Sequence, residues 1–165
     1  MTPRVLLGPV LAALVLCPAP ARALSCTAAV PPLAFGTYNV FSASPLNSGG
    51  TVTVTCSSLL SIFVSFDVTL SAGSSGTIGS SGGGGNSART MTNGAATLAY
   101  QVYVDSARSR VWGSSSQRSS QFTGGYLLDI LFPVVTSFDF YAQIPARQNV
   151  PPGLYTDMLV VTVTY

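Results

Sequence analysis

The sequence predicts an all-β protein, and three observations favour an immunoglobulin-like β-sandwich. Apolar and polar residues alternate in several short runs, which is the pattern of strands with one buried face. Turn-forming residues separate these runs, and no segment after the N-terminal region keeps a helical period. Two cysteines, Cys26 and Cys56, follow that region, and in an exported chain such a pair typically forms one disulfide. Short strands, turn-rich connections and one disulfide are typical of a sandwich or barrel, with the immunoglobulin-like sandwich preferred.

Residues 1–23 have the features of a secretory signal peptide. A positive charge lies near the start, a short apolar run follows, and residues 21–23 (Ala-Arg-Ala) match a cleavage site. The apolar run is shorter than the roughly 20 residues of a membrane-spanning helix. We therefore expect cleavage between Ala23 and Leu24, which leaves one domain over residues 24–165.

The charge of the predicted domain is unusual. The sequence contains no Lys, Glu or His, and without Arg4 and Arg22 its arginines equal its five aspartates in number. The formal net charge of the domain is then zero. A neutral surface disfavours nucleic acid as a partner, because nucleic-acid binding needs a basic patch. It also gives little electrostatic protection against self-association.

The first part of the domain is expected to contain three strands. Residues 33–39 predict a short strand with an irregularity at Gly36. Residues 47–50 (Asn-Ser-Gly-Gly) predict a turn. Residues 51–56 and 62–70 alternate strictly and predict the next two strands. The side chains expected to face inward are Val52, Val54, Cys56, Ile62, Val64, Phe66, Val68 and Leu70.

Residues 71–88 are rich in Ser and Gly and predict a polar loop. We place this loop inside one domain, because neither flanking part is long enough to build a core alone. The four glycines at 82–85 are followed by neither Lys nor a helix, so they do not form a phosphate-binding loop.

The second part predicts four further strands, over residues 98–104, 126–132, 138–144 and 155–165. Residues 105–113 are expected to turn the chain and end near Trp112, and residues 114–125 are polar and irregular. The final strand places Leu159, Val161, Val163 and Tyr165 on one face. No later segment of this sequence follows to pair with its free edge, and exposed edges are aggregation templates that proteins normally cover.

The sequence offers little for catalysis. A Ser-His-Asp arrangement is impossible without His, and the five aspartates are well separated. No calcium loop or zinc pattern is present, so we expect no cofactor, no metal and no enzyme activity. A pair of carboxylates meeting in space would revive a hydrolase. Sugar stacking on aromatic side chains is a further alternative to core packing, and its candidates are Tyr100, Tyr103, Trp112 and Tyr126.

A set of short motifs carries a family resemblance. They are PLAFGTYN, TVTVTC, TLSAG, RTM, LAYQVYVD, ARSRVWG, YAQIPARQNVPPGLYTD and a terminal LVVTVTY, after a cysteine near the start of the domain. Together they closely resemble the spore coat protein U domain family, which includes subunits of archaic chaperone–usher pili. The resemblance covers nearly all of residues 26–165.

The resemblance implies an incomplete immunoglobulin-like sandwich that lacks its last strand until another protein donates one. A periplasmic chaperone would lend a strand, and an outer-membrane usher would exchange it for a strand of another pilus or coat subunit. Leu159, Val161, Val163 and Tyr165 would then form one wall of the acceptor groove, and Cys26 and Cys56 match the family's disulfide. The implied role is a secreted structural or adhesive subunit at the cell surface that supports attachment and biofilm formation.

Two further expectations concern position and adhesion. Only Leu24 and Ser25 precede Cys26 after the expected cleavage, whereas polymerising subunits carry a donor extension there, so we expect a tip subunit. Tip adhesins of the family often have two domains, and this chain has one. Candidate adhesive contacts are Phe41, Leu59, Leu60 and Phe122, which could instead cap the core. The alternative functions are a self-complete secreted carbohydrate-binding module and a spore or cell coat protein.

Overall fold

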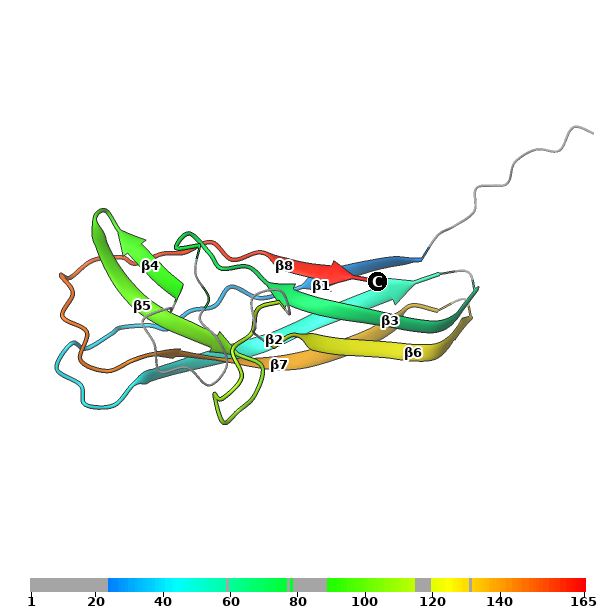
Figure 1. The fold of residues 1–165 in the computed structure, drawn as a ribbon, viewed down its shortest axis with the longest axis horizontal. Coiled ribbons are helices and arrows are strands. Elements are labelled where there is room, and N and C mark those ends of the chain that lie inside the picture. Colours follow the sequence, from blue (N-terminus) through cyan, green and yellow to red (C-terminus); the bar gives the residue numbers. More distant parts are fainter. Residues whose placement is uncertain (1–23, 59, 77, 79–88, 115–119, 131) are drawn as a thin grey trace, which may run out of the picture.

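The computed structural model describes residues 24–58, 60–76, 78, 89–114, 120–130 and 132–165, and every regular element in these ranges is a β-strand (Figure 1). The predicted signal peptide, the glycines at 82–85 and Leu59 lie outside the described residues. The strands are β1 (Ser25–Ala29), β2 (Leu46–Ser57), β3 (Leu60–Leu70), β4 (Arg89–Asn93), β5 (Ala96–Tyr103), β6 (Phe122–Ile130), β7 (Val134–Ile144) and β8 (Val161–Thr164).

The strands form two antiparallel sheets. A five-stranded sheet has the order β1-β2-β7-β5-β4, and a three-stranded sheet has the order β6-β3-β8. The long strands β2 and β7 pair from Leu46↔Ile144 to Cys56↔Val134 and run along most of the molecule (Figure 1). The all-β fold is confirmed, and the two sheets are consistent with an immunoglobulin-like sandwich.

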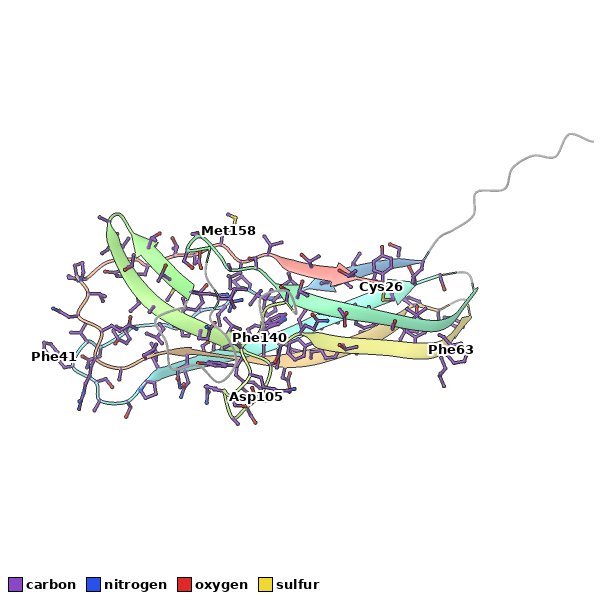
Figure 2. The ribbon with its side chains drawn as sticks, viewed as in Figure 1. Cys26, Phe41, Phe63, Asp105, Phe140 and Met158 are labelled. Atoms are coloured by element: carbon purple, nitrogen blue, oxygen red, sulfur yellow. A yellow bond between two sulfur atoms is a disulfide. The ribbon has the colours of Figure 1, made fainter. Side chains whose placement is uncertain are left out.

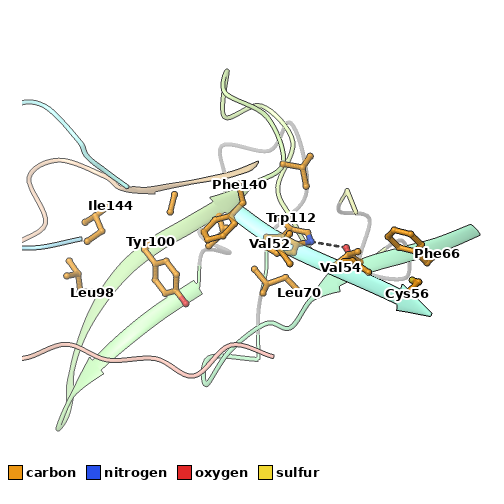
Figure 3. Close-up of a cluster of buried hydrophobic side chains, with 14 residues drawn as sticks. Val52, Val54, Cys56, Phe66, Leu70, Leu98, Tyr100, Trp112, Phe140 and Ile144 are labelled. Carbon is orange, nitrogen blue, oxygen red and sulfur yellow. Dashed lines mark hydrogen bonds between the residues drawn. The ribbon is translucent and has the colours of Figure 1, made fainter. Parts of the chain in front are cut away.

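The core lies between the two sheets and follows the predicted alternation. Val52, Val54 and Cys56 of β2 are buried, and every second residue from Val64 to Leu70 of β3 is buried opposite them. Trp112 lies at the centre of this cluster, and its Nε1–H donates to the backbone oxygen of Val68 at 3.0 Å (Figure 3). Burial of each large apolar side chain stabilises the fold by about 1.5–3 kcal/mol.

Aromatic rings fill the centre of the sandwich. The ring centroids of Trp112 and Phe122 are 5.0 Å apart in an edge-to-face contact, and those of Phe122 and Phe138 are 5.0 Å apart in a stacked contact. Phe140 and Phe66 extend the group, with centroids 5.5 Å from Trp112 and 6.2 Å from Phe138 respectively. Such pairs add stability beyond their buried area.

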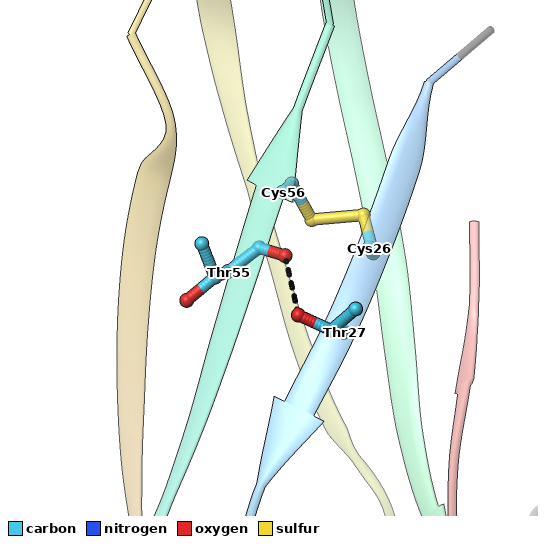
Figure 4. Close-up of a disulfide and its surroundings, with 4 residues drawn as sticks. All are labelled: Cys26, Thr27, Thr55 and Cys56. Atoms are coloured by element: carbon cyan, nitrogen blue, oxygen red, sulfur yellow. Dashed lines mark hydrogen bonds between the residues drawn. A yellow bond between two sulfur atoms is a disulfide. The ribbon is translucent and has the colours of Figure 1, made fainter.

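The predicted disulfide is present and joins the first two strands. Cys26 of β1 bonds Cys56 of β2, and the two residues are direct partners in the strand register (Figure 4). Thr27 lies next to it and donates weakly from its Oγ1 to the oxygen of Thr55 at 3.5 Å. The disulfide therefore fixes a short edge strand to the long central strand beside it.

Two predictions for the first part of the domain were wrong. Residues 47–50 are not a turn but the start of β2, where they pair with β7. A Cβ atom at Gly49 would lie 2.6 Å from the backbone oxygen of Phe140, so glycine here permits close strand approach. Residues 33–39 are not a strand: they follow an irregular path, and Leu33, Phe35 and Tyr38 pack against the core.

Two predictions for the second part also needed correction. Strand β6 covers Phe122–Ile130 rather than residues 126–132, and Phe132, which follows it, is 77% exposed. The final strand is much shorter than residues 155–165, because β8 covers only Val161–Thr164. Residues 155–160 are held instead by separate hydrogen bonds that are described below. Among the described residues, no helix is long and apolar enough to cross a membrane.

Candidate functional site

An apolar groove runs between the N-terminal segment 30–40 and the C-terminal segment 150–161. It consists of two hollows with volumes of about 470 Å³ and about 900 Å³. The hollows share lining residues from both segments and from β4, so they form one continuous groove. The shared residues are Leu33, Phe35, Met91, Tyr155 and Thr156.

The floor of the groove is the hydrophobic core itself. Core residues of both sheets line it, and Phe35 from the N-terminal wall contacts the ring of Tyr100 edge-on, with centroids 5.9 Å apart. The core residues in the floor are Leu70, Leu98, Tyr100, Val102, Trp112, Phe140 and Ile144. In the described residues the groove therefore lies directly over the core of the sandwich, and its floor residues are themselves buried.

The strands beside the groove are the edge strands of their sheets. Strand β1 ends the five-stranded sheet and β8 ends the three-stranded sheet, and each pairs with one neighbour in the described part of the chain. The two strands lie close together near the disulfide (Figures 1 and 4). The groove opens from there toward the other end of the molecule.

The hydrogen-bonding direction of β8 follows from its pairing with β3. The N–H of Ser71 donates to the oxygen of Val160 at 2.9 Å, so the backbone of Val160 points toward β3. Backbone groups alternate direction along a strand. The N–H and C=O groups of Val161 and Val163 therefore point away from β3, while their side chains pack against the core.

The same argument applies to β1. The Cα atoms of Cys26 and Cys56 are 4.0 Å apart, the close spacing of a pair that does not exchange backbone hydrogen bonds. The backbone groups of Cys26 and Ala28 therefore point away from β2. In the described residues both edge strands therefore have backbone groups that point away from their paired neighbours.

The residues predicted to form the groove wall lie along this edge. Leu159 and Val161 line the groove, Val163 packs against the core, and Tyr165 is 54% exposed at the chain end. Their role in strand acceptance stays a prediction.

The candidate adhesive residues do not form one surface. Phe41 is 91% exposed at one end of the molecule (Figure 2). Phe122 is packed inside the aromatic group with Trp112 and Phe138, which is the core-capping alternative. Leu60 is the first residue of β3 and is the register partner of Ile130, and Leu59 lies outside the described residues.

Sequence reasoning missed a polar contact in the groove. The hydroxyl of Tyr100 on β5 donates to Oδ2 of Asp157 at 2.6 Å, and both residues line the groove. Oδ1 of Asp157 accepts from the backbone N–H groups of Ser74 and Met158, each at 2.8 Å. Burial raises the pKa of Asp157, but these hydrogen bonds, led by that from Tyr100, outweigh it and hold the pKa below its ordinary value. Burial also raises the pKa of Tyr100, so its hydroxyl stays protonated and donates.

A buried arginine lies behind the groove floor. Arg89 on β4 is fully buried and donates to the oxygens of Ser71 and Trp112 and to Oε1 of Gln101, over 2.7–2.9 Å. Burial lowers the pKa of Arg89 to about 10, so the guanidinium is still charged at neutral pH. In the sequence, Arg89 and Met91 are two residues apart and therefore share one strand face. The burial of Arg89 could not be predicted from this, because its hydrogen-bond partners are distant in the chain.

The remaining carboxylates described in full have local structural contacts. Asp67 accepts from Thr123, Asp139 accepts from Thr51, and Asp105 accepts from Ser109 and Arg110 in a turn. Among the described residues no group of His, Cys, Asp or Glu could hold a metal ion. Most side chains of the groove floor are apolar, and the Tyr100–Asp157 pair adds one polar contact.

Comparisons with known proteins agree with this fold. A chain of the crystal structure of the CsuC–CsuE chaperone–tip adhesion subunit pre-assembly complex, from the archaic chaperone–usher Csu pili of Acinetobacter baumannii, superimposes with a TM-score of 0.54 at 19% identity. The match covers 87% of this chain and 40% of that chain. Protein U of Myxococcus xanthus is 38% identical over 79 residues, which are 47% of this chain and 40% of that protein.

The two proteins compared are therefore longer than the regions they share with this chain. The structural likeness supports the fold alone, since its sequence identity is low. The family assignment comes from a model of the Spore Coat Protein U domain, which matches residues 12–162. The resemblance inferred from the sequence motifs is confirmed: the chain belongs to the spore coat protein U domain family.

Proposed function

We propose that this protein is a structural or adhesive subunit of a surface pilus or coat, built through the chaperone–usher pathway by strand donation. The observation that carries the proposal is the continuous apolar groove over the core, whose two walls continue into the edge strands β1 and β8. Membership of the family and the fold shared with a chain of a chaperone–tip adhesion subunit complex support it.

A donated strand fits the physical requirements of the groove. Backbone groups of the donor would pair with those of β1 or β8, and every second donor side chain would point to the floor. Apolar side chains at those positions would pack over Tyr100, Val102 and Phe140, which line the groove. The donor would supply the missing part of the core, and the open strand edges would no longer template aggregation.

The partners and location follow from this role. The first donor would be a periplasmic chaperone, an outer-membrane usher would catalyse the exchange, and the second donor would be another pilus or coat subunit. The product would lie on the cell surface and support attachment and biofilm formation, with no enzymatic step. The tip position of the subunit stays a prediction.

Thermal unfolding with a model donor tests the proposal. The probe is a synthetic peptide of about ten residues in which Val and Thr alternate, the length of a long strand. The control peptide has the same composition with all Val residues in one block. A ligand that binds only the folded state raises the unfolding temperature, by about 2.7 kcal/mol of stability at a concentration 100 times its Kd. We expect a concentration-dependent rise with the alternating peptide alone, and an equal response to both peptides would contradict strand donation.

The carbohydrate-binding alternative has less support. Sugar stacking needs exposed aromatic faces, but Tyr100 is 2% and Trp112 is 1% exposed, while Tyr103 and Tyr126 are half-buried. A domain that folds without a donated strand would also not need an apolar groove over its core. This alternative would be supported if the purified protein bound glycans and its unfolding temperature did not change with the alternating peptide.

A further inference from the structure

Five of the sequence motifs meet at one polar cluster beside the groove. The TLSAG motif supplies Ser71, and RTM supplies Arg89. The motifs LAYQVYVD, ARSRVWG and the segment ending in YTD supply the remaining residues. The hydrogen-bonded members are Ser71, Arg89, Tyr100, Gln101, Trp112 and Asp157. Neither the core nor the binding of an apolar strand explains why these polar groups gather here.

The Tyr100–Asp157 hydrogen bond connects the floor of the groove to its C-terminal wall. Tyr100 belongs to β5 in the five-stranded sheet, and Asp157 precedes β8 of the three-stranded sheet. Glycine at position 73 makes room for the carboxylate, because a Cβ atom there would lie 2.2 Å from Oδ2 of Asp157. Gly73 also has a φ of +73°, which favours glycine.

Two neighbouring contacts hold the same wall segment. Thr156 exchanges backbone hydrogen bonds with Thr92 of β4, at 2.9 and 3.1 Å. The backbone of Val160 bonds Ser71 through both its N–H and its oxygen, and Arg89 in turn donates to the oxygen of Ser71. The wall is thus attached to the five-stranded sheet through Thr156 and Asp157, and to the core polar cluster through Val160.

We propose that Tyr100 and Asp157 are positioning residues that hold the groove open before a donor strand arrives. This inference rests on the proposed function of the groove. Among the described strands none pairs with residues 157–159. The apolar side chains that line the groove favour collapse of this wall onto the floor. The Tyr100–Asp157 pair fixes the distance between wall and floor, so the binding-competent state is already populated. Without the pair, the apparent affinity would fall by the fraction of molecules that remain open.

Binding kinetics of the alternating Val–Thr peptide test this role. The variant is Tyr100→Phe, which keeps the ring in the core and removes only the donated hydrogen bond. The matched control is Thr51→Val, which removes another hydroxyl-to-carboxylate bond, to Asp139 at 2.7 Å, away from the groove. We expect the Kd of Tyr100→Phe to rise roughly tenfold, the range of one hydrogen bond to a charged group. The rise should come from slower association, with little change in the dissociation rate.

The possible outcomes distinguish the proposed function from the proposed role of the Tyr100–Asp157 pair. If the peptide fails to bind the unaltered protein, the proposed function itself is contradicted. A second outcome is that the peptide binds, but Tyr100→Phe lowers only the unfolding temperature and leaves the Kd and the association rate unchanged, as in Thr51→Val. The pair would then have only a structural role, and the inference would be wrong. A slower association specific to Tyr100→Phe supports it.

A second variant tests the other partner of the same hydrogen bond. Asp157→Asn keeps the size of the side chain, but an amide cannot accept from Tyr100, Ser74 and Met158 together because its nitrogen is a donor. We expect the same slow association of the peptide. Normal association in Asp157→Asn would overturn the assignment of Asp157.

Discussion

At the scale of single residues, the uncommon feature is the amount of polar chemistry that surrounds an apolar groove. Among the described residues the buried, charged Arg89 has no direct carboxylate partner, and it is hydrogen-bonded by carbonyl and amide oxygens instead. Asp157 is half-buried and accepts three hydrogen bonds, one from a tyrosine and two from the backbone. Buried polar groups are costly unless they are satisfied, and here nearly every member has partners with defined geometry.

Asp157 makes stability depend on acid pH. Its pKa is lowered in the folded state by hydrogen bonds to the charged form, so its contribution is complete above the ordinary value of about 4 and is lost as the pH falls through the folded value. We expect the unfolding temperature to fall as the pH is lowered below about 4. The slope should be smaller in Asp157→Asn, measured by circular dichroism. Asp105 also has a lowered pKa and will leave a residual slope, so identical slopes in both proteins would contradict this role of Asp157.

At the scale of elements, the two groove walls continue into the edge strands β1 and β8. β1 is a five-residue edge strand whose only pairing among the described strands is with β2, so the Cys26–Cys56 bond carries much of its attachment. β8 pairs with β3 through four residues and keeps its other side free. Short edge strands are easily frayed, and fraying of either would loosen the groove wall that continues it.

Replacing both cysteines by serine tests the contribution of the disulfide. A disulfide of this kind typically stabilises a protein by about 2–4 kcal/mol through restriction of the unfolded chain. We expect a loss in this range in urea unfolding, together with weaker binding of the Val–Thr peptide. Unchanged peptide binding in a folded double variant would show that β1 does not contribute to the groove.

Opposite faces of β8 should respond differently to the same substitution. Val161 lines the groove and Thr162 is exposed on the other face. A carboxylate at Val161 would meet the apolar side chains of a donor without a partner, which costs several kcal/mol in a buried setting. We therefore expect Val161→Asp to abolish peptide binding and Thr162→Asp to preserve it, measured by fluorescence anisotropy. Equal effects of both variants would contradict the assigned direction of the groove.

The strands with clear alternation of apolar and polar residues could be predicted from the sequence. The prediction was wrong where the structure depends on close contact between the backbones of distant segments. The apolar face of β2 at Val52, Val54 and Cys56 was predictable from period-two patterning alone. The glycines before it looked like a turn, because their partner, Phe140, is distant in the chain. The Tyr100–Asp157 contact could not be predicted, since it depends on how two sheets meet over a separation of 57 residues.

At the scale of the whole molecule, the protein combines a small formal net charge of +2 with exposed aromatic rings at both ends. Phe41 is 91% exposed at one end and Phe63 is 77% exposed at the other (Figure 2). No large net charge opposes contact with apolar surfaces or with other copies. This surface suits a protein that works within an assembly.

Substitutions at Phe41 and Phe122 should affect different properties, surface attachment in the first case and folding stability in the second. Phe41→Ser alters an exposed ring, so we expect a stability change within about 0.5 kcal/mol and weaker retention on a hydrophobic surface. Phe122→Ser removes a ring from the aromatic group and should cost about 3–5 kcal/mol. Urea unfolding and quartz-crystal adsorption measure the two effects. Full retention of Phe41→Ser would exclude Phe41 as an adhesive contact.

The most direct test of the central claim is amide hydrogen exchange at β8, followed by NMR with and without the alternating Val–Thr peptide. The N–H groups of Val161 and Val163 point toward the free edge, whereas that of Thr162 points toward Thr69 of β3 and serves as an internal reference. We predict fast exchange at Val161 and Val163 in the empty protein, and slowing by at least roughly tenfold when the peptide is bound. Protection of these two amides before any peptide is added, or fast exchange that persists at saturating peptide, would contradict an open groove that accepts a donated strand.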